Sequence, residues 1–391
     1  MFSDISNNPE ILRNIRYRLR PKTLILTILI VNVLFISIGL LALLPKKYIS
    51  VSDFRDLFLV YAWFAVIINF SYAIALTTTS LVGEKDKKTY DYLFMTPLSD
   101  RAIAIGKLIG STVNMWLILA TMLPYLVITG IFGGLNTFRL IQFFPILILG
   151  ALFSASLGLL ISTSITKMAS GFTGIFILLI LMSFSIGLSQ SCCGYIRFLG
   201  LLSPFSILFH IRDQFSPRYY HGQFTDSISF FGSDISGGWL TIFLFVWFTY
   251  WIMRAVTRRV RNPQGGFLTQ IEALIFFVVF EVLLVGFQLE YLHNQPLYGG
   301  YFKEAFAAYL LVNGFILITL SLGLTLSREN YFQYIRNRLL RQPYQILGGQ
   351  NPSHFIFALL YAILITGFIT MASYQQTLVT WLSIYVLLGT I

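Results

Sequence analysis

The protein has 391 residues, of which 56% are hydrophobic and only 11% are charged. Soluble domains contain about 25% charged residues, and so much apolar surface can neither stay disordered nor be hidden in a soluble core of this size. The composition therefore excludes a disordered chain, argues against a soluble domain and favours a helical membrane protein. The formal net charge of +11 indicates basic loops at a cytoplasmic membrane face rather than nucleic-acid binding.

Apolar runs long enough to cross a bilayer, at roughly 20 residues per crossing, recur along the chain. We predict an all-α, polytopic membrane helix bundle with about ten transmembrane helices. The predicted spans lie near residues 23–44, 57–82, 108–131, 142–165, 169–190, 238–256, 268–289, 303–326, 354–373 and 376–391. With the N-terminus in the cytoplasm, 19 of the 27 Lys and Arg residues fall inside and 8 outside. The positive-inside rule therefore predicts that both termini are cytoplasmic.

The first predicted element is a basic amphipathic helix within residues 1–22. Asn8 followed by Pro9 is typical of a helix start. The residues that follow place Ile11 and its apolar neighbours on one face and Arg13 with other arginines largely on the opposite face. We expect an interfacial helix in the headgroup plane that leads into the first span. The alternative is a simple basic leader.

The most informative segment is the predicted cytoplasmic connection of residues 83–107, GEKDKKTYDYLFMTPLSDRAIAIGK. Its opposite charges, such as Glu84 and Lys88, have the i,i+4 spacing of ion pairs on a helix. An apolar stripe that includes Leu93 follows, and Pro97 ends the helix. The segment is therefore predicted to form a short amphipathic helix between two spans. Such a helix either lies on its own membrane surface or binds a partner.

This pattern resembles the signature of ABC type-2 exporter permeases, in which a segment of the form E-x-x-x-G-T-x-E-x-L-L-x-T-P-L-S between the second and third spans forms a coupling helix. In that family the coupling helix docks in a cleft of the ATPase subunit and passes nucleotide-driven movement to the membrane domain. The resemblance assigns the coupling helix to residues 84–99. It assigns ATPase coupling to Glu84, Lys88, Thr89, Asp91, Leu93, Thr96, Pro97 and Lys107. Lys88 departs from the family's usual Gly, and Asp91 from the common Glu.

The resemblance covers about residues 1–257 and implies an ABC type-2 permease-like domain with a six-helix core. Residues 258–391 add four more predicted helices, which the resemblance does not explain. The loop of residues 191–237 is too apolar for a solvated loop and is broken by glycine and proline. It resembles the family's outer re-entrant helical hairpin, and a small external subdomain is the alternative.

Glu281 lies near the middle of the seventh predicted span. A carboxylate at mid-bilayer is costly unless it is paired, protonated or hydrated, so it is a candidate for a proton or cation relay. The alternative is a protonated carboxyl that bonds a neighbouring helix. Other polar residues inside spans, Asn32, Asn69, Asn114 and Thr77 to Thr79, either line a pathway or join helices, and interhelical hydrogen bonding is the favoured interpretation.

The sequence contains no G-x-x-x-x-G-K-[ST] motif, so the chain has no P-loop of its own. By the resemblance, a separate ABC ATPase subunit binds ATP and Mg, while this chain binds no cofactor or metal and has no catalytic residue. The same resemblance implies a second permease chain, identical or related, in the plasma (inner) membrane, with lipids rather than nucleic acid around it. It predicts a permease subunit that couples ATP hydrolysis to outward movement of a substrate, which the sequence leaves open.

Two other classes remain as alternatives. An ion-gradient-driven secondary transporter would use Glu281 as its coupling site. A membrane-embedded glycosyl- or lipid-transferring enzyme would use acidic residues in an outer loop, where Asp53 and Asp56 are the suggestive pair. Those two residues are equally typical of a solvated helix cap.

Overall fold

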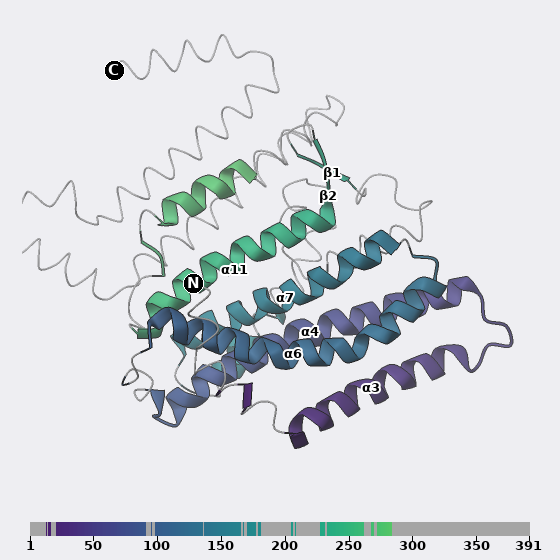
Figure 1. Ribbon diagram of the computed structural model, residues 1–391, viewed down its shortest axis with the longest axis horizontal. Helices are drawn as coiled ribbons and strands as arrows, with labels where there is room; N and C mark the ends of the chain where they lie inside the picture. The colour runs from purple at the N-terminus through teal and green to yellow at the C-terminus, as the bar shows by residue number, and fades with distance from the viewer. Residues whose placement is uncertain are drawn as a thin grey trace, which may run out of the picture. The chain divides into compact units, whose positions relative to one another are not determined.

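Five long helices form the part of the chain that the computed structural model describes (Figure 1). The described residues are 13, 15–16, 21–90, 95, 98–135, 137–165, 167, 170–176, 179–180, 205, 208, 227–230, 233–261, 267–269 and 272–283. The helices are α3 (Pro21–Leu43), α4 (Val51–Asp86), α6 (Asp100–Phe132), α7 (Thr137–Ser164) and α11 (Gly237–Arg261). Each is long and apolar enough to cross a membrane. They confirm the first four predicted spans and the sixth, and the protein is a multi-pass helical membrane bundle.

The remaining predicted spans are described in part or not at all. Residues 170–176 and 179–180 are helical within the fifth predicted span, and residues 272–283 are helical within the seventh. The last three predicted spans lie outside the described residues, so the total of ten helices and the cytoplasmic position of the termini stay predictions. Residues 264–391 belong to a second compact unit, whereas all five long helices belong to the first.

Two short strands, β1 (Ser227–Phe230) and β2 (Ser233–Ser236), form a two-stranded sheet just before α11. They lie in the loop for which we predicted a re-entrant helical hairpin, with a small external subdomain as the alternative, and they are the only strands among the described residues of this helical bundle. Serine alternates with isoleucine or phenylalanine along β1, which is the period of a strand. Most of the loop lies outside the described residues, and the re-entrant hairpin stays a prediction.

The helix α4 is central, since it packs most extensively on α7 and on α6, while α11 packs on α7. The contact between α4 and α7 is close because small residues line it. A Cβ atom on Gly158 would lie 2.2 Å from Oγ1 of Thr77 and 2.7 Å from the carbonyl oxygen of Ile74. Gly150 and Ser154 precede Gly158 on α7 at four-residue spacing. Such a series lets two helix backbones approach within a membrane.

Hydrogen bonds between helices use the polar residues inside the spans. Asn69 Nδ2 donates to the carbonyl oxygen of Leu147 on α7 at 2.8 Å, and Thr78 Oγ1 donates to that of Gly158 at 3.2 Å. Two further bonds run from the Tyr125 hydroxyl to Asn32 Oδ1 at 3.0 Å and from Asn114 Nδ2 to the Tyr72 hydroxyl at 3.5 Å. The interhelical interpretation is therefore confirmed for Asn32, Asn69, Asn114 and Thr78. It is wrong for Thr77 and Thr79, whose hydroxyls donate to carbonyl oxygens of their own helix.

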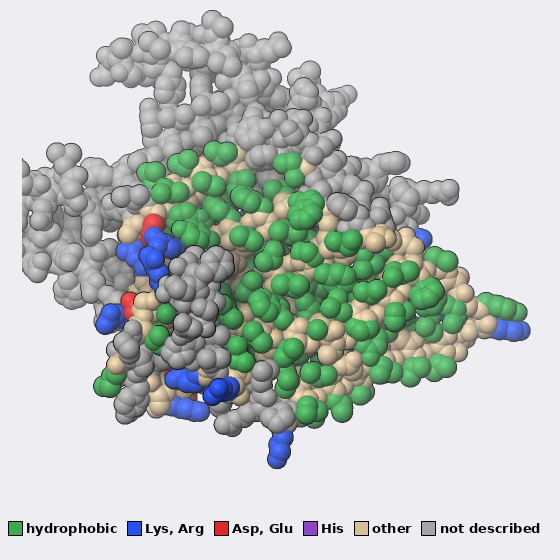
Figure 2. All heavy atoms as spheres, in the orientation of Figure 1, with side chains coloured by type: hydrophobic (Ala, Val, Ile, Leu, Met, Phe, Trp, Pro, Cys, Tyr) green, Lys and Arg blue, Asp and Glu red, His purple; other side chains and the backbone are tan. Residues whose placement is uncertain are grey.

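Apolar side chains cover the visible face of the described helices, and Lys and Arg side chains lie toward its ends (Figure 2). The helix α3 is the least covered by its neighbours: only 11% of its most apolar window is buried, and Leu41 is 77% exposed. A broad apolar surface of this kind is stable only against lipid or another membrane chain, which agrees with the span assignment.

Candidate functional site

Three helices end and one begins at the same end of the bundle, which we call the basic end. There the last turns of α4, α7 and α11 meet the first turns of α6. With 36 residues, α4 is roughly 54 Å long at 1.5 Å per residue, well beyond the ~30 Å hydrocarbon core of a bilayer. Its charged last turn therefore extends past the apolar part of the membrane. This explains why hydropathy alone placed the end of the second span four residues too early.

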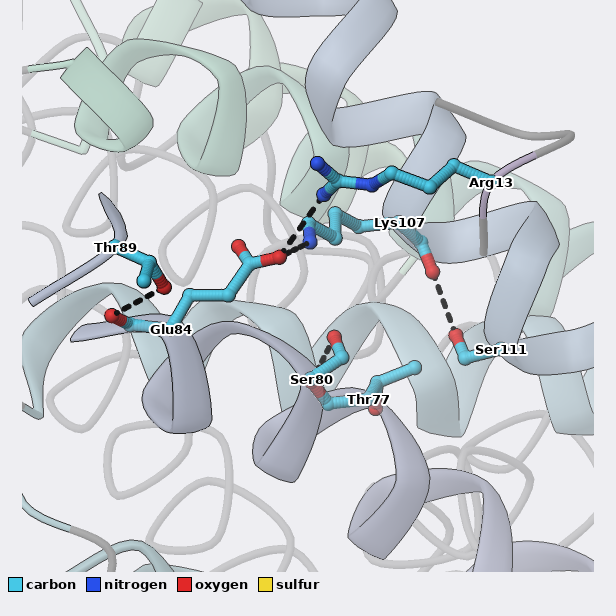
Figure 3. A network of polar contacts seen from close by, with 7 residues as sticks. All are labelled: Arg13, Thr77, Ser80, Glu84, Thr89, Lys107 and Ser111. Carbon is cyan, nitrogen blue, oxygen red and sulfur yellow. Dashed lines mark hydrogen bonds and ion pairs between the residues drawn. The ribbon is translucent and has the colours of Figure 1, made fainter. Parts of the chain in front are cut away.

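The carboxylate of Glu84 holds two cations at the basic end (Figure 3). Its Oε1 lies 2.5 Å from Nζ of Lys107 on α6 and 3.0 Å from Nη2 of Arg13 in the leader. The Lys107 side chain is only 1% exposed, against 23% for Glu84 and 56% for Arg13. A buried ammonium group is stable only when it is paired, so this ion pair fixes α4 to α6. The helix α6 begins at Asp100, ahead of Lys107, and is capped by Ser99, whose Oγ accepts from the Ala102 amide at 3.2 Å.

The chain leaves α4 through a turn with a left-handed residue at its centre. Lys88 has φ of 55°, its amide donates to the carbonyl oxygen of Lys85 at 3.1 Å, and the Thr89 amide donates to that of Glu84 at 2.9 Å. These two bonds form a Schellman motif, the helix ending that favours glycine at its left-handed position. The Gly that is usual at this position in the resemblance described above suits a left-handed residue. In this chain Lys88 occupies that position, which is strained for a residue with a Cβ atom.

This turn contradicts one sequence-based expectation. The i,i+4 spacing predicted a helical ion pair between Glu84 and Lys88. Because α4 ends at Asp86 and Lys88 is left-handed, these two residues do not share a helix. Glu84 belongs to the last turn of the span, and its carboxylate points to Lys107 instead.

Lys85 is a residue of the basic end that sequence reasoning missed. Its Nζ atom donates to three backbone carbonyl oxygens at the end of α7: those of Ser162 at 2.7 Å, Thr163 at 2.8 Å and Ile165 at 3.3 Å. The last carbonyls of a helix lack partners within the helix and carry its partial negative charge. Lys85 therefore caps α7 from α4. The sequence offers only a lysine at the end of a span as a signal, and this is common in membrane proteins.

Two further contacts connect the basic end to α11. The Tyr90 hydroxyl donates to the carbonyl oxygen of Val260, and the Lys85 ammonium lies 5.4 Å from the centre of the Tyr90 ring. Arg259 Nη1 donates to Ser164 Oγ at 2.9 Å. The contacts form a closed ring that runs from Lys85 to α7, from α7 to α11, and from α11 back through Tyr90.

The predicted coupling residues are thus brought together in part. Glu84, Thr89 and Lys107 share one network, and Thr89 also donates through its hydroxyl to the Glu84 carbonyl oxygen at 3.2 Å. Asp91, Leu93, Thr96 and Pro97 lie outside the described residues.

Glu281 is 4% exposed on the helical residues 272–283. It belongs to the second compact unit rather than to the one that contains the basic end.

Asp53, in the first predicted outer loop, has a structural role. Asp53 Oδ2 accepts from the Ser50 amide at 2.7 Å at the start of α4, and Asp53 also pairs with Lys46. The helix-cap interpretation of Asp53 is therefore confirmed. Among the described residues, no group of three or more His, Cys, Asp or Glu side chains could hold a metal ion.

A bundle of apolar helices with a charged network at the end of α4 is the architecture of an integral membrane protein. The family profile described as ABC-2 family transporter protein matches residues 41–253, more than half of the chain. The protein belongs to this family, which confirms the resemblance seen in its sequence. The match includes Glu84, Lys85 and Lys107. No curated protein matches the sequence.

Proposed function

We propose that this chain is the transmembrane permease subunit of an ATP-driven exporter. A separate ABC ATPase docks on the segment after α4, binds ATP and Mg, and drives outward movement of a substrate. The observation that carries this proposal is the Glu84 carboxylate, which joins α4, α6 and the leader at the start of the segment that resembles a coupling helix. Any displacement of that segment acts on packed helices through an ion pair that is buried at Lys107.

The residues of this segment have different proposed roles. Lys88 and Thr89 are exposed at the turn and are available to an ATPase. Lys107 is buried, so it contributes by holding Glu84 rather than by contacting a partner. Leu93 and Pro97 are proposed to contact the ATPase on the basis of the family pattern. A second permease chain completes the substrate pathway, and this chain performs no chemistry itself.

The proposal is tested by purifying the tagged chain in mild detergent, identifying the proteins that accompany it and measuring ATP hydrolysis. The variant Leu93→Asp places a charge in the predicted coupling stripe. The control Tyr48→Asp places the same charge on a side chain that is 82% exposed in the loop between α3 and α4, at the other end of the bundle. We expect an ABC ATPase to accompany the native chain and the control, and to be lost from Leu93→Asp.

Two outcomes would overturn the proposal. One is the absence of any ATPase from the intact native chain in several detergents. The other is ATPase retention by Leu93→Asp equal to that of the control. In the first case, transport driven by an ion gradient through Glu281 becomes the leading alternative, and dependence on that gradient would identify it.

A further inference from the structure

Glu84 and Lys85 are neighbours in sequence but contact different helices beside α4. Consecutive residues on a helix point about 100° apart, and these two side chains reach different helices. Glu84 reaches Lys107 on α6, whereas Lys85 reaches the end of α7. The last turn of α4 is therefore attached on both sides, by an ion pair on one and by hydrogen bonds on the other.

The attachment to α7 uses the full donor capacity of a lysine. An ammonium group has three N–H donors, and Lys85 makes three hydrogen bonds to carbonyl oxygens, at Ser162, Thr163 and Ile165. Bonds with a charged donor are stronger than neutral ones, and the target is the negative end of a helix dipole. The contact therefore resists separation of the two helix ends.

We propose that Lys85 is a positioning residue of the transport cycle, through which displacement of the segment after α4 is carried to α7. This inference rests on the proposed function, because it requires an ATPase that moves the segment. The helix α11 then moves with α7 through the bond from Arg259 to Ser164. It also moves with the segment after α4 through the bond from Tyr90 to Val260. Loss of Lys85 leaves the ion pair of Glu84 and Lys107 intact, so the segment still moves with α6.

The experiment measures two distances in the complex with its ATPase, by double electron–electron resonance between spin labels. Cys192 and Cys193 are first changed to Ser. Labelled cysteines are then introduced at exposed positions: Tyr48→Cys between α3 and α4, at the end of the bundle away from the moving segment, as the reference, with either Lys87→Cys after α4 or Lys167→Cys after α7. Each pair is measured without nucleotide and after trapping with ADP and vanadate. Singly labelled complexes give the distances between two permease chains, which are subtracted.

In the native complex we expect trapping to shift both distances. In Lys85→Met the distance to residue 87 should still shift, and the shift at residue 167 should be lost. Lys85→Arg, which keeps a charged donor, should restore the shift at residue 167. Lys22→Met removes the same charge from an exposed side chain at the start of α3, outside the proposed coupling residues, and should leave both shifts unchanged. If Lys85 only stabilised the fold, Lys85→Met would alter the shifts of both spin-label pairs alike. The difference between the two shifts is therefore the informative result.

The two proposals fail in different ways. A native complex that contains the ATPase but shows no shift in either pair overturns the proposed function, and the inference with it. A native shift at both positions that persists at residue 167 in Lys85→Met overturns the inference alone. Should Lys85→Met fail to assemble, Lys85→Gln replaces it. Its neutral amide weakens the contact with the carbonyl oxygens of α7, so the shift at residue 167 should shrink, and an unchanged shift there would overturn the inference.

Discussion

The two ends of the bundle hold their charges in different ways. At the end where α4 begins, Asp53 bonds to Ser50 and Lys46, which lie three and seven residues away. At the basic end, Glu84 bonds to residues 23 and 71 positions away, and Lys85 reaches across 77 or more. The first end is thus a self-contained helix cap, whereas the second connects separate helices.

This difference indicates where force can enter the molecule. Local contacts fix the geometry of one turn and transmit little to the remaining helices. Contacts between helices convert displacement of one helix end into displacement of its neighbours, provided that the contacts outlast the movement. The basic end has these contacts, and the ABC-2 family match includes it. Substitutions at the two ends test whether their contacts differ in this way.

The largest effect is expected from Glu84→Ala. The change removes the carboxylate that neutralises a Lys107 side chain with 1% exposure, and an uncompensated buried charge destabilises a protein by about 3 kcal/mol or more. The midpoint of thermal unfolding in detergent, followed by size-exclusion chromatography, should fall clearly. The double variant Glu84→Ala, Lys107→Met removes both charges and should recover most of the loss. Equal midpoints for the single and double variants would show that the pair is not the source of the effect.

A smaller effect is expected from Asp53→Ala at the opposite end. The change removes the cap of α4 and the ion pair with Lys46, and both are local. The thermal midpoint should fall less than with Glu84→Ala, and faster hydrogen exchange should be confined to the first turn of α4. Lys46→Ala, which keeps the cap, should have less effect still. Exchange that also rises at the basic end would contradict the distinction between the two ends.

The fold was predictable to the extent that hydropathy decides it. Five spans were located from apolar runs alone, because the bilayer imposes their length. Their ends were less predictable: α6 begins at Asp100, eight residues before its predicted span. A charged turn continues a helix without adding to its hydropathy, so the apolar run cannot reveal it. The two short strands were missed because four-residue segments give little periodic signal.

The sequence predicted several residues of the candidate site, but not which groups those residues contact. The family pattern selected Glu84, Thr89 and Lys107, which the structure brings together. It could not select Lys85, whose partners are backbone carbonyl groups on another helix and leave no trace in the side-chain sequence. It also predicted a pair of Glu84 with Lys88, because the spacing is correct for a helix and nothing in that spacing reveals where α4 ends.

The smallest expected effect is a gain of stability in Lys88→Gly. At φ of 55° a lysine is strained by its Cβ, and glycine is not. Glycine loses more conformational freedom on folding, which offsets part of the relief, so a net stabilisation of about 0.5–1 kcal/mol is expected. The thermal midpoint should rise slightly.

Lys87→Gly is the matched control: φ there is −80°, an ordinary value that offers no strain to relieve, so this change should lower the midpoint. A fall with both variants would mean that the left-handed turn does not govern the end of α4. A rise with Lys88→Gly alone would show that this chain keeps the family's turn geometry at a cost in stability, and that its lysine is retained for another reason, such as contact with the ATPase.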